Sequence, residues 1–199
     1  MRSASGLGGT MDSITDAKKE WRARLRAGRS ALSESRITDG SSRITVVAAT
    51  LALGPTVAAY IPVGREPGGS GLIDALAARA RVLLPVTPVE PGPLDWAEYD
   101  GALAEGAYRL LEPTGPRLGP DAVLRATTVL LPALGVSRTG VRIGRGAGYY
   151  DRSLGAFTGR RVAVVYDDEV VDSLPAEPTD VPVDAALTPS GLIEFSVAP

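Results

Sequence analysis

The residues best suited to chemistry lie in one run of the sequence, RIGRGAGYYDR, from Arg142 to Arg152. Glycine occupies positions 144, 146 and 148, so the backbone there can adopt positive φ and bring bare N–H groups close to a ligand. Arg142 and Arg145 place positive charge beside those N–H groups. This combination binds anions, so the run predicts an anion-binding loop that opens into a short helix. We call residues 144–148 the glycine loop.

The composition excludes several kinds of catalysis. The chain has no cysteine and no histidine, which excludes disulfides, thiolate nucleophiles, the usual zinc sites and imidazole acid–base catalysis. The remaining groups suit phosphoryl transfer, in which positioning and charge stabilisation do most of the catalysis. A net charge of −2 gives no sign of nucleic-acid binding, and no apolar run has membrane-spanning length. Because the first ten residues also lack a continuous hydrophobic region, we expect a cytoplasmic protein that binds neither nucleic acid nor membrane.

The hydrophobic pattern predicts two helices followed by alternating strands and helices. Apolar residues at helical spacing predict an amphipathic helix over residues 14–32, with a capping box at Ser13 and Asp16, and a second helix over 37–51. The later predicted elements are strands at 56–63, 81–87, 127–134, 160–168 and within 183–189, a helix at 70–80, and a pair of strands or a lid at 93–101 and 107–113.

This order of elements defines an α/β protein. We expect a single three-layer domain over residues 13–199, with a twisted, mostly parallel sheet flanked by helices, after a disordered tail over residues 1–12. Ligands of such sheets bind beyond the carboxyl ends of the strands, and the glycine loop follows the predicted strand 127–134. The position of the loop therefore agrees with its composition.

Two nucleotide-binding motifs can be tested against the glycine spacing. A P-loop requires a Gly-Lys pair, and the chain has none. A dinucleotide-binding fingerprint requires GxGxxG after a strand and an acidic residue about 20 positions later, where Asp167 and Asp168 do lie. The spacing here is GxGxG, with Tyr149 at the position of the third glycine. Dinucleotide binding therefore stays open only as a minor alternative.

Four runs of the sequence resemble, in order, signatures of the 5-formyltetrahydrofolate cyclo-ligase family, also called methenyltetrahydrofolate synthetase. They are AKKEWRARLRAGRSALS (17–33), YIPVGREP (60–67), the glycine-loop run, and LPAEPTD (174–180). The resemblance covers most of the chain from residue 17 onward and implies a NagB/RpiA/CoA transferase-like fold.

The resemblance implies a reaction that uses ATP and Mg²⁺. The γ-phosphoryl group of ATP would be transferred to the formyl oxygen of 5-formyltetrahydrofolate, with or without a polyglutamate tail. Nitrogen 10 would then attack the imino-phosphate and phosphate would leave, giving 5,10-methenyltetrahydrofolate, ADP and phosphate. Phosphorylation turns a poor leaving group, an amide-like oxygen, into a good one, so the protein has to align two substrates and neutralise charge. We expect a monomer.

The resemblance also implies roles for individual residues. Lys18 and Arg145 would be catalytic, with Arg145 contacting the γ-phosphate, and Asp151 and Asp180 match magnesium ligands. The ATP-binding set is Lys18, Arg22, Arg142, Gly144, Arg145, Gly146, Ala147, Gly148, Tyr149 and Tyr150. The folate-binding set is Ile61, Glu66, Tyr108, Arg145, Gly148 and Tyr149. A carboxylate such as Glu66 suits the N–H edge of a pterin, and tyrosine rings stack on its face.

Some of these residues have a plainer interpretation. Without the resemblance, Asp180 is equally typical of a turn, Tyr108 of a half-buried sheet residue, and Trp96 of packing. The chain also departs from the usual residues of the family at Val136, Ser137, Glu169 and Thr179. These departures leave open an alternative in which the chain is a catalytically weak or inactive paralogue that only binds folate or nucleotide. Retention of both catalytic residues and Asp151 argues against that alternative.

Overall fold

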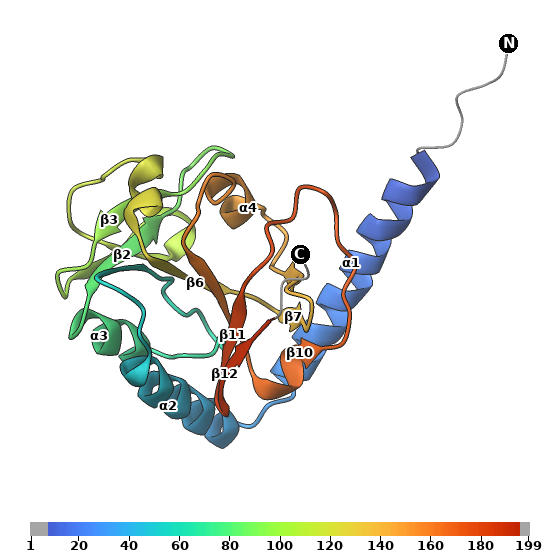
Figure 1. Ribbon diagram of the computed structural model, residues 1–199, viewed down its shortest axis with the longest axis horizontal. Helices are drawn as coiled ribbons and strands as arrows, with labels where there is room; N and C mark the ends of the chain where they lie inside the picture. The colour runs from blue at the N-terminus through green and yellow to red at the C-terminus, as the bar shows by residue number, and fades with distance from the viewer. Residues whose placement is uncertain (1–7, 196–199) are drawn as a thin grey trace, which may run out of the picture.

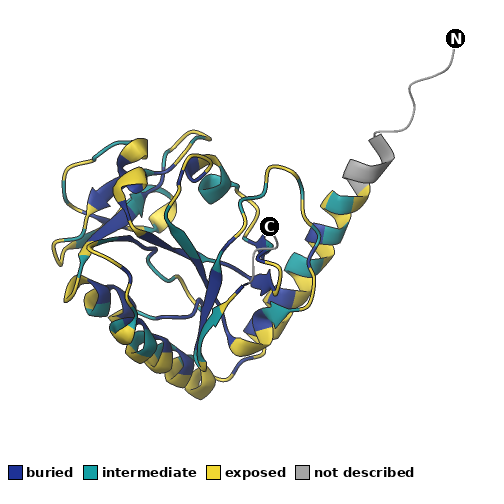
Figure 2. Ribbon diagram, viewed as in Figure 1, coloured by how far each residue is buried: buried dark blue, intermediate teal, exposed yellow. Residues whose placement is uncertain are grey.

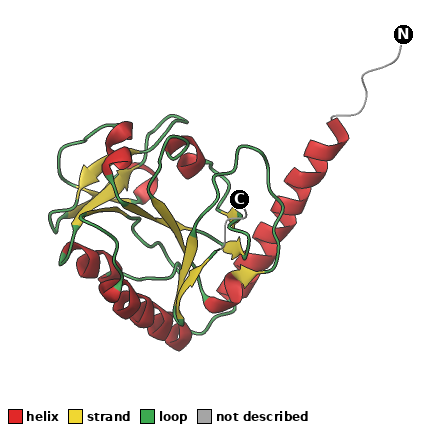
Figure 3. Cartoon of the chain, in the orientation of Figure 1, coloured by secondary structure: helices red, strands yellow, loops and turns green. Residues whose placement is uncertain are grey.

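The computed structural model describes the backbone of residues 8–195 and the side chains of residues 13–195 (Figure 1). Within this part of the chain, a seven-stranded sheet runs through the molecule in the order β12-β11-β9-β6-β1-β2-β3 (Figures 1 and 3). The strands are β1 Thr56–Ala58, β2 Arg81–Val86, β3 Asp95–Glu98, β6 Thr128–Pro132, β9 Arg160–Val164, β11 Ala185–Thr188 and β12 Gly191–Glu194.

The sheet is mostly parallel. Neighbouring strands from β11 to β2 are parallel, whereas β12 and β3, at the two edges, pair antiparallel with their neighbours. β1, α3 (Gly71–Ala77) and β2 form the predicted βαβ unit, with Val57 beside Val82. The central strands are rich in valine, leucine and alanine, as expected for a parallel sheet covered on both faces. The predicted α/β class is confirmed.

Helices cover both faces of the sheet and complete three layers. α2 (Glu34–Thr50) and α3 bury Ile44 and Leu72 against one face. A 3-10 helix, η2 (Pro120–Arg125), and α4 (Tyr149–Ser153) lie on the other face, where Trp96 is fully buried, as its assignment to packing predicts. Buried residues are concentrated along the sheet, and the outer side of α2 is exposed (Figure 2).

The glycine inside α2 has a packing reason. α2 begins after Ser33, whose Oγ accepts a hydrogen bond from the Arg36 N–H at 3.2 Å, as an N-cap should. A Cβ at Gly40 would lie 2.9 Å from Cε1 of the Tyr166 ring. Glycine therefore lets this helix approach the ring closely, which offsets the weaker helix propensity.

The first helix begins earlier than predicted. α1 extends over Gly8–Ser30, so it starts inside the segment expected to be a tail, and the capping box at Ser13 does not mark its start. Residues 1–7 of that segment lie outside the described residues. Among the described residues, no helix is long and apolar enough to cross a membrane.

α1 packs beside a small second sheet rather than on the central one. That sheet has the order β10-β7-β8, with β7 at Gly135–Ser137, β8 at Arg142–Ile143 and β10 at Val170–Val171. Leu25 of α1 packs there with Leu134 and Ile143. A buried ion pair also holds α1, because Arg29 donates to Glu169 at 2.6 and 2.7 Å and to the Ala133 carbonyl at 2.8 Å. Burial raises the pKa of Glu169, and the bonds from Arg29 oppose that shift.

Several short elements were missed or misassigned from the sequence. β7, β8, β10 and β12 were not predicted, since strands this short give too few residues for a periodic pattern. The strands expected at 93–101 and 107–113 do not pair with each other, because β3, in the first of these segments, pairs with β2 at the edge of the central sheet. β4 (Leu103–Glu105) and β5 (Leu111–Pro113) pair with each other around a 3-10 turn, η1 (Ala107–Arg109). The β7–β8 hairpin brings the glycine loop back beside the end of β6, where the Leu134 N–H donates to the Ile143 carbonyl at 2.7 Å.

Candidate active site

A cavity of about 920 Å³ lies at the carboxyl ends of β1, β2 and β6. Tyr60 and Ile61, just after β1, Thr87 after β2 and Ala133 after β6 all line it. The site therefore occupies the position that the parallel sheet predicts.

The sequence-predicted site residues all line this one cavity. They come from α1, from the segment after β1, from the 3-10 turn η1, from β8 and the glycine loop with α4, and from the segment before β11. They are Lys18, Arg22, Ile61, Glu66, Tyr108, Arg142, Gly144, Arg145, Gly146, Ala147, Gly148, Tyr149, Tyr150, Asp151 and Asp180.

Sequence reasoning missed other lining residues. Most are apolar or belong to no motif, so nothing in the sequence marked them as part of a site. Glu177 lies in the LPAEPTD run and Arg152 ends the glycine-loop run, so the charge of these two residues could have marked them as site candidates. The missed residues are Tyr60, Val63, Pro85, Thr87, Leu94, Leu110, Leu111, Pro132, Ala133, Ile143, Arg152, Glu177 and Thr179.

The glycine loop has the backbone features of an anion-binding loop. Gly146 and Gly148 have φ of 108° and 68°, which confirms the expected positive φ at two of the three glycines. Gly144 is needed for space instead, because a Cβ there would lie 2.9 Å from Nη1 of Arg142. No backbone N–H of residues 144–148 donates a hydrogen bond to another described residue. These N–H groups are therefore available to an anionic ligand.

Three carbonyl groups of the loop, in contrast, accept hydrogen bonds from arginine side chains. Arg22 Nε donates to the Gly144 carbonyl at 3.3 Å, and Arg26 Nη2 donates to the Arg145 carbonyl at 2.9 Å, both from α1. Arg152 Nη2 of α4 donates to the Ala147 carbonyl at 2.9 Å. Acceptors that would repel an anion are thus occupied by cationic groups.

The context of the loop does not fit dinucleotide binding. That fingerprint places the glycines directly between a strand of the parallel sheet and a helix. Here the loop follows β8, which pairs antiparallel with β7 in the small second sheet. The minor alternative therefore loses its structural support.

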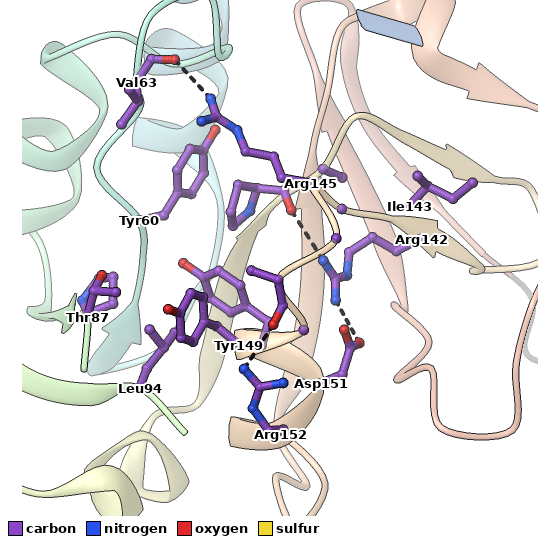
Figure 4. A pocket seen from close by; sticks show the side chains of 18 of the residues that line it. Tyr60, Val63, Thr87, Leu94, Arg142, Ile143, Arg145, Tyr149, Asp151 and Arg152 are labelled. Carbon is purple, nitrogen blue, oxygen red and sulfur yellow. Dashed lines mark hydrogen bonds and ion pairs between the residues drawn. The ribbon is translucent and has the colours of Figure 1, made fainter. Parts of the chain in front are cut away.

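Asp151 and Asp180 lie on the same wall of the cavity. Arg142, whose side chain is buried, donates from Nη2 to Asp151 Oδ1 at 2.8 Å (Figure 4). The Val181 N–H, next to Asp180, donates to the same oxygen at 3.4 Å. No cluster of three or more carboxylates that could hold a metal ion occurs among the described residues. These two aspartates could therefore hold a cation only together with ligand and water oxygens, which is how Mg²⁺ is usually bound.

Lys18 brings α1 into the site. It is only 5 % exposed, and its Nζ lies 2.6 Å from Asp180 Oδ2 and 2.7 Å from Glu177 Oε2. The Glu177 N–H also donates to Asp180 Oδ2 at 2.7 Å. A buried ammonium placed between two carboxylates keeps the segment before β11 against α1.

Arg145 reaches from the glycine loop to the segment after β1. Its Nη2 donates to the Val63 carbonyl at 3.4 Å (Figure 4). The same Nη2 lies 3.0 Å from Glu66 Oε1. Glu66 Oε2 accepts from the Val63 N–H at 2.9 Å. The Glu66 side chain is 8 % exposed and that of Arg145 is 55 % exposed, so the carboxylate is held in place while the arginine faces solvent. The residues expected at the ATP and folate ends thus meet in one ion pair.

Tyrosines form an aromatic wall of the cavity. Burial raises the pKa of Tyr60 and Tyr150, and the charge of Glu66 raises both further, so their hydroxyls stay neutral. Tyr108 lies in η1 rather than in a strand, is 65 % exposed, and has φ of 57°. The alternative interpretation of Tyr108 as a half-buried sheet residue is therefore wrong. Interaction with Tyr149 is the main cause that raises the pKa of Tyr108.

The departures from family residues lie mostly away from the cavity. Val136 is in the core, and Ser137 is buried at the end of β7, where its Oγ accepts from the Val141 N–H at 3.0 Å. Glu169 forms the buried pair with Arg29. Only Thr179 of the four is among the lining residues described above. The alternative of an inactive paralogue is not favoured, because three of the four departures have structural roles.

The fold and the site together define an α/β protein with a glycine loop, whose N–H groups are unbonded among the described residues, over a cavity large enough for substrate-sized ligands. The profile of the 5-formyltetrahydrofolate cyclo-ligase family matches residues 14–189, and the chain belongs to this family. A curated 5-formyltetrahydrofolate cyclo-ligase from Mycolicibacterium smegmatis is 48% identical over 144 residues, which is 68% of this chain and 74% of that protein. One from Escherichia coli is 32% identical over 70% of this chain and 81% of its own length.

Solved structures agree with the sequence comparisons. The NMR structure of 5,10-methenyltetrahydrofolate synthetase from Aquifex aeolicus superposes with a TM-score of 0.77 at 26% identity, covering 92% of this chain and 94% of that one. A 5,10-methenyltetrahydrofolate synthetase from Mycoplasma pneumoniae, at 22% identity, shares the fold with a TM-score of 0.68.

Proposed function

We propose that this protein is an ATP-dependent cyclo-ligase that converts 5-formyltetrahydrofolate to 5,10-methenyltetrahydrofolate, with release of ADP and phosphate. The observation that carries the proposal is the shared cavity: a glycine loop with available N–H groups and a buried carboxylate with an aromatic wall line the same space. Arg145 contacts both parts through its place in the loop and its pair with Glu66. Membership of the family supports the same reaction.

The loop end of the cavity suits the triphosphate of ATP. Backbone N–H groups of residues 144–148 and the cations Lys18, Arg22 and Arg142 surround that end. Asp151 and Asp180 would hold Mg²⁺ there, and the ion would neutralise phosphate charge when bound. Arg145 would balance the charge that develops on the transferred phosphoryl group.

The opposite end suits the pterin and the formyl group. Glu66 offers a carboxylate fixed by the Val63 N–H, and Ile61, Tyr108 and Tyr149 supply apolar and aromatic surface. Folates with or without a polyglutamate tail form the substrate class. The chain would act as a cytoplasmic monomer.

The chemistry follows from holding the two substrates in one cavity. Transfer of the γ-phosphoryl group breaks its bond to ADP and forms a bond to the formyl oxygen. Nitrogen 10 then bonds to the formyl carbon, the carbon–oxygen bond to phosphate breaks, and the proton of nitrogen 10 passes to water. Each step depends on alignment and charge balance, which arginines, carboxylates and backbone N–H groups supply without cysteine or histidine.

The test mixes purified protein with 5-formyltetrahydrofolate, Mg²⁺ and ATP and follows the near-ultraviolet absorbance that appears only when the methenyl bridge closes. We expect growth of this band only with ATP, and a loss of at least about 100-fold in rate for Arg145→Ala and for Asp151→Ala. Asp39 and Arg43 form an exposed pair on α2, so Arg43→Ala and Asp39→Ala are matched controls that should keep the rate. A flat trace from folded wild-type protein would reject the proposal.

A further inference from the structure

Two arginines outside the expected site residues, one on α1 and one on α4, hold carbonyl groups of the glycine loop. Arg152 of α4 donates to the Ala147 carbonyl at 2.9 Å (Figure 4). Arg26 of α1 donates to the Arg145 carbonyl, also at 2.9 Å. Arg152 also donates to the Gly92 carbonyl at 3.2 Å. Both side chains are exposed, so their contribution to folding is small.

The planarity of the peptide bond links these contacts to the ligand side of the loop. A carbonyl and the N–H of the next residue belong to one rigid, trans plane and point in opposite directions. Arg26 therefore fixes the direction of the Gly146 N–H, and Arg152 fixes that of the Gly148 N–H. Gly146 and Gly148 have positive φ and no side chain. Their two peptide planes can therefore turn unless another group holds them.

Arg152 makes further contacts with the same part of the loop. Its guanidinium lies 5.3 Å from the centre of the Tyr149 ring, and its Nη1 would lie 2.9 Å from a Cβ at Gly148. It therefore packs against three consecutive residues, Ala147, Gly148 and Tyr149. Arg26 makes no such contact and does not line the cavity.

We infer that Arg26 and Arg152 are positioning residues for ATP binding, which orient the N–H groups of Gly146 and Gly148 toward the phosphates. Arg152 also holds the Tyr149 ring on the folate side. The inference rests on the proposed function, because it assigns these residues to the phosphate end of that same cavity. It adds cations that hold the loop carbonyls to the cations that would contact the ligand directly.

The experiment compares Arg26→Met and Arg152→Met with wild type. Titration calorimetry without folate measures the Kd for ATP, and the absorbance assay measures KM for each substrate. We expect each variant to weaken ATP binding about tenfold, as for loss of a charged hydrogen-bond donor. Arg26→Met should leave the KM for folate unchanged, whereas Arg152→Met should raise it, since only Arg152 stacks on Tyr149. Arg26→Lys and Arg152→Lys, which keep a cationic donor, should recover part of the ATP affinity.

Two other arginines provide matched controls. Arg24 lies on α1 and stacks on Trp21 at 4.9 Å, and Arg161 stacks on Phe157 and donates to its carbonyl, but neither lines the cavity. Arg24→Met and Arg161→Met should bind ATP like wild type. Unchanged ATP affinity in both test variants, or an equal loss in the controls, overturns the inference. If the wild-type protein neither binds ATP nor forms product, the proposed function is overturned as well. Failure of the proposed function is thus seen in the wild type, and failure of the inference alone is seen only in the variants.

Discussion

At the scale of single residues, the same amino acid has different roles within one motif. Arg142 and Arg145 are three positions apart, yet Arg142 is buried against Asp151 whereas Arg145 is exposed and reaches Glu66. Arg142 therefore fixes a carboxylate in place, and Arg145 remains available to a ligand. The three glycines differ likewise, because Gly146 and Gly148 need positive φ and Gly144 needs space.

Replacement of Gly146 tests the backbone of the loop. Gly146→Ala puts a side chain at φ of 108°, a conformation that costs about 1–3 kcal/mol, so the loop should relax away from its binding geometry. We expect at least about a tenfold loss in ATP affinity, because the N–H groups no longer converge. Calorimetry gives the affinity and thermal unfolding gives the stability.

Gly101 provides the control for this substitution. It has φ of 97°, lies in a turn, and has no neighbouring atom within 4 Å of an added Cβ. Gly101→Ala should lower the free energy of unfolding by a similar amount and leave ATP affinity unchanged. Equal ATP affinity in both variants would show that the conformation of Gly146 does not matter for binding.

At the scale of elements, strands of the central sheet hold the segment that carries Glu66. Tyr60, just after β1, donates its hydroxyl to the Pro67 carbonyl at 2.7 Å, and Tyr166, after β9, donates to the Arg65 carbonyl at 3.3 Å. The carboxylate thus lies between two residues whose carbonyls are tied to the sheet. Tyr60 is buried, and its burial makes the stability of the folded protein depend on pH.

Tyr60 should make the protein less stable at alkaline pH. Burial raises the pKa of Tyr60 well above its ordinary value, so the folded state keeps a proton that the unfolded chain loses near pH 10. The stabilisation is complete below that pH and is lost as pH rises, by at most about 1.4 kcal/mol per pH unit for one group. In urea unfolding, Tyr60→Phe should show a shallower fall above about pH 10 than wild type. Parallel curves above that pH would contradict the prediction.

At the scale of the whole molecule, the cavity joins parts of the chain that are distant in sequence. α1, the segment after β1, the glycine loop with α4, and the segment before β11 all supply residues that line it. A ligand that fills the cavity would contact all of these segments, and its binding energy would add to the stability of the whole domain.

ATP with Mg²⁺ should raise the thermal midpoint of unfolding. At a ligand concentration of 100 times Kd, the expected gain is about 2.7 kcal/mol, which removal of the ligand should reverse. Asp151→Ala should lose most of this shift, whereas Asp39→Ala, on the exposed side of α2, should keep it. Differential scanning calorimetry measures each midpoint, and an equal shift in both variants would remove Asp151 from the ligand site.

The sequence by itself determined the features that depend on neighbouring residues. Three glycines and two arginines within a few positions are enough to predict an anion-binding loop, and apolar runs are enough to predict the strands of a parallel sheet. The absence of histidine and cysteine limited the chemistry before any fold was known. The family resemblance then named the residues that line the cavity.

Only the tertiary structure decided which of these residues meet. Lys18 and Asp180 are 162 positions apart and lie 2.6 Å from each other, and Arg145 reaches Glu66 from a different part of the chain. The β7–β8 hairpin, too short to predict, sets where the glycine loop lies. Such contacts depend on strand order and on helix packing, which arise from burial of the whole core rather than from any local pattern.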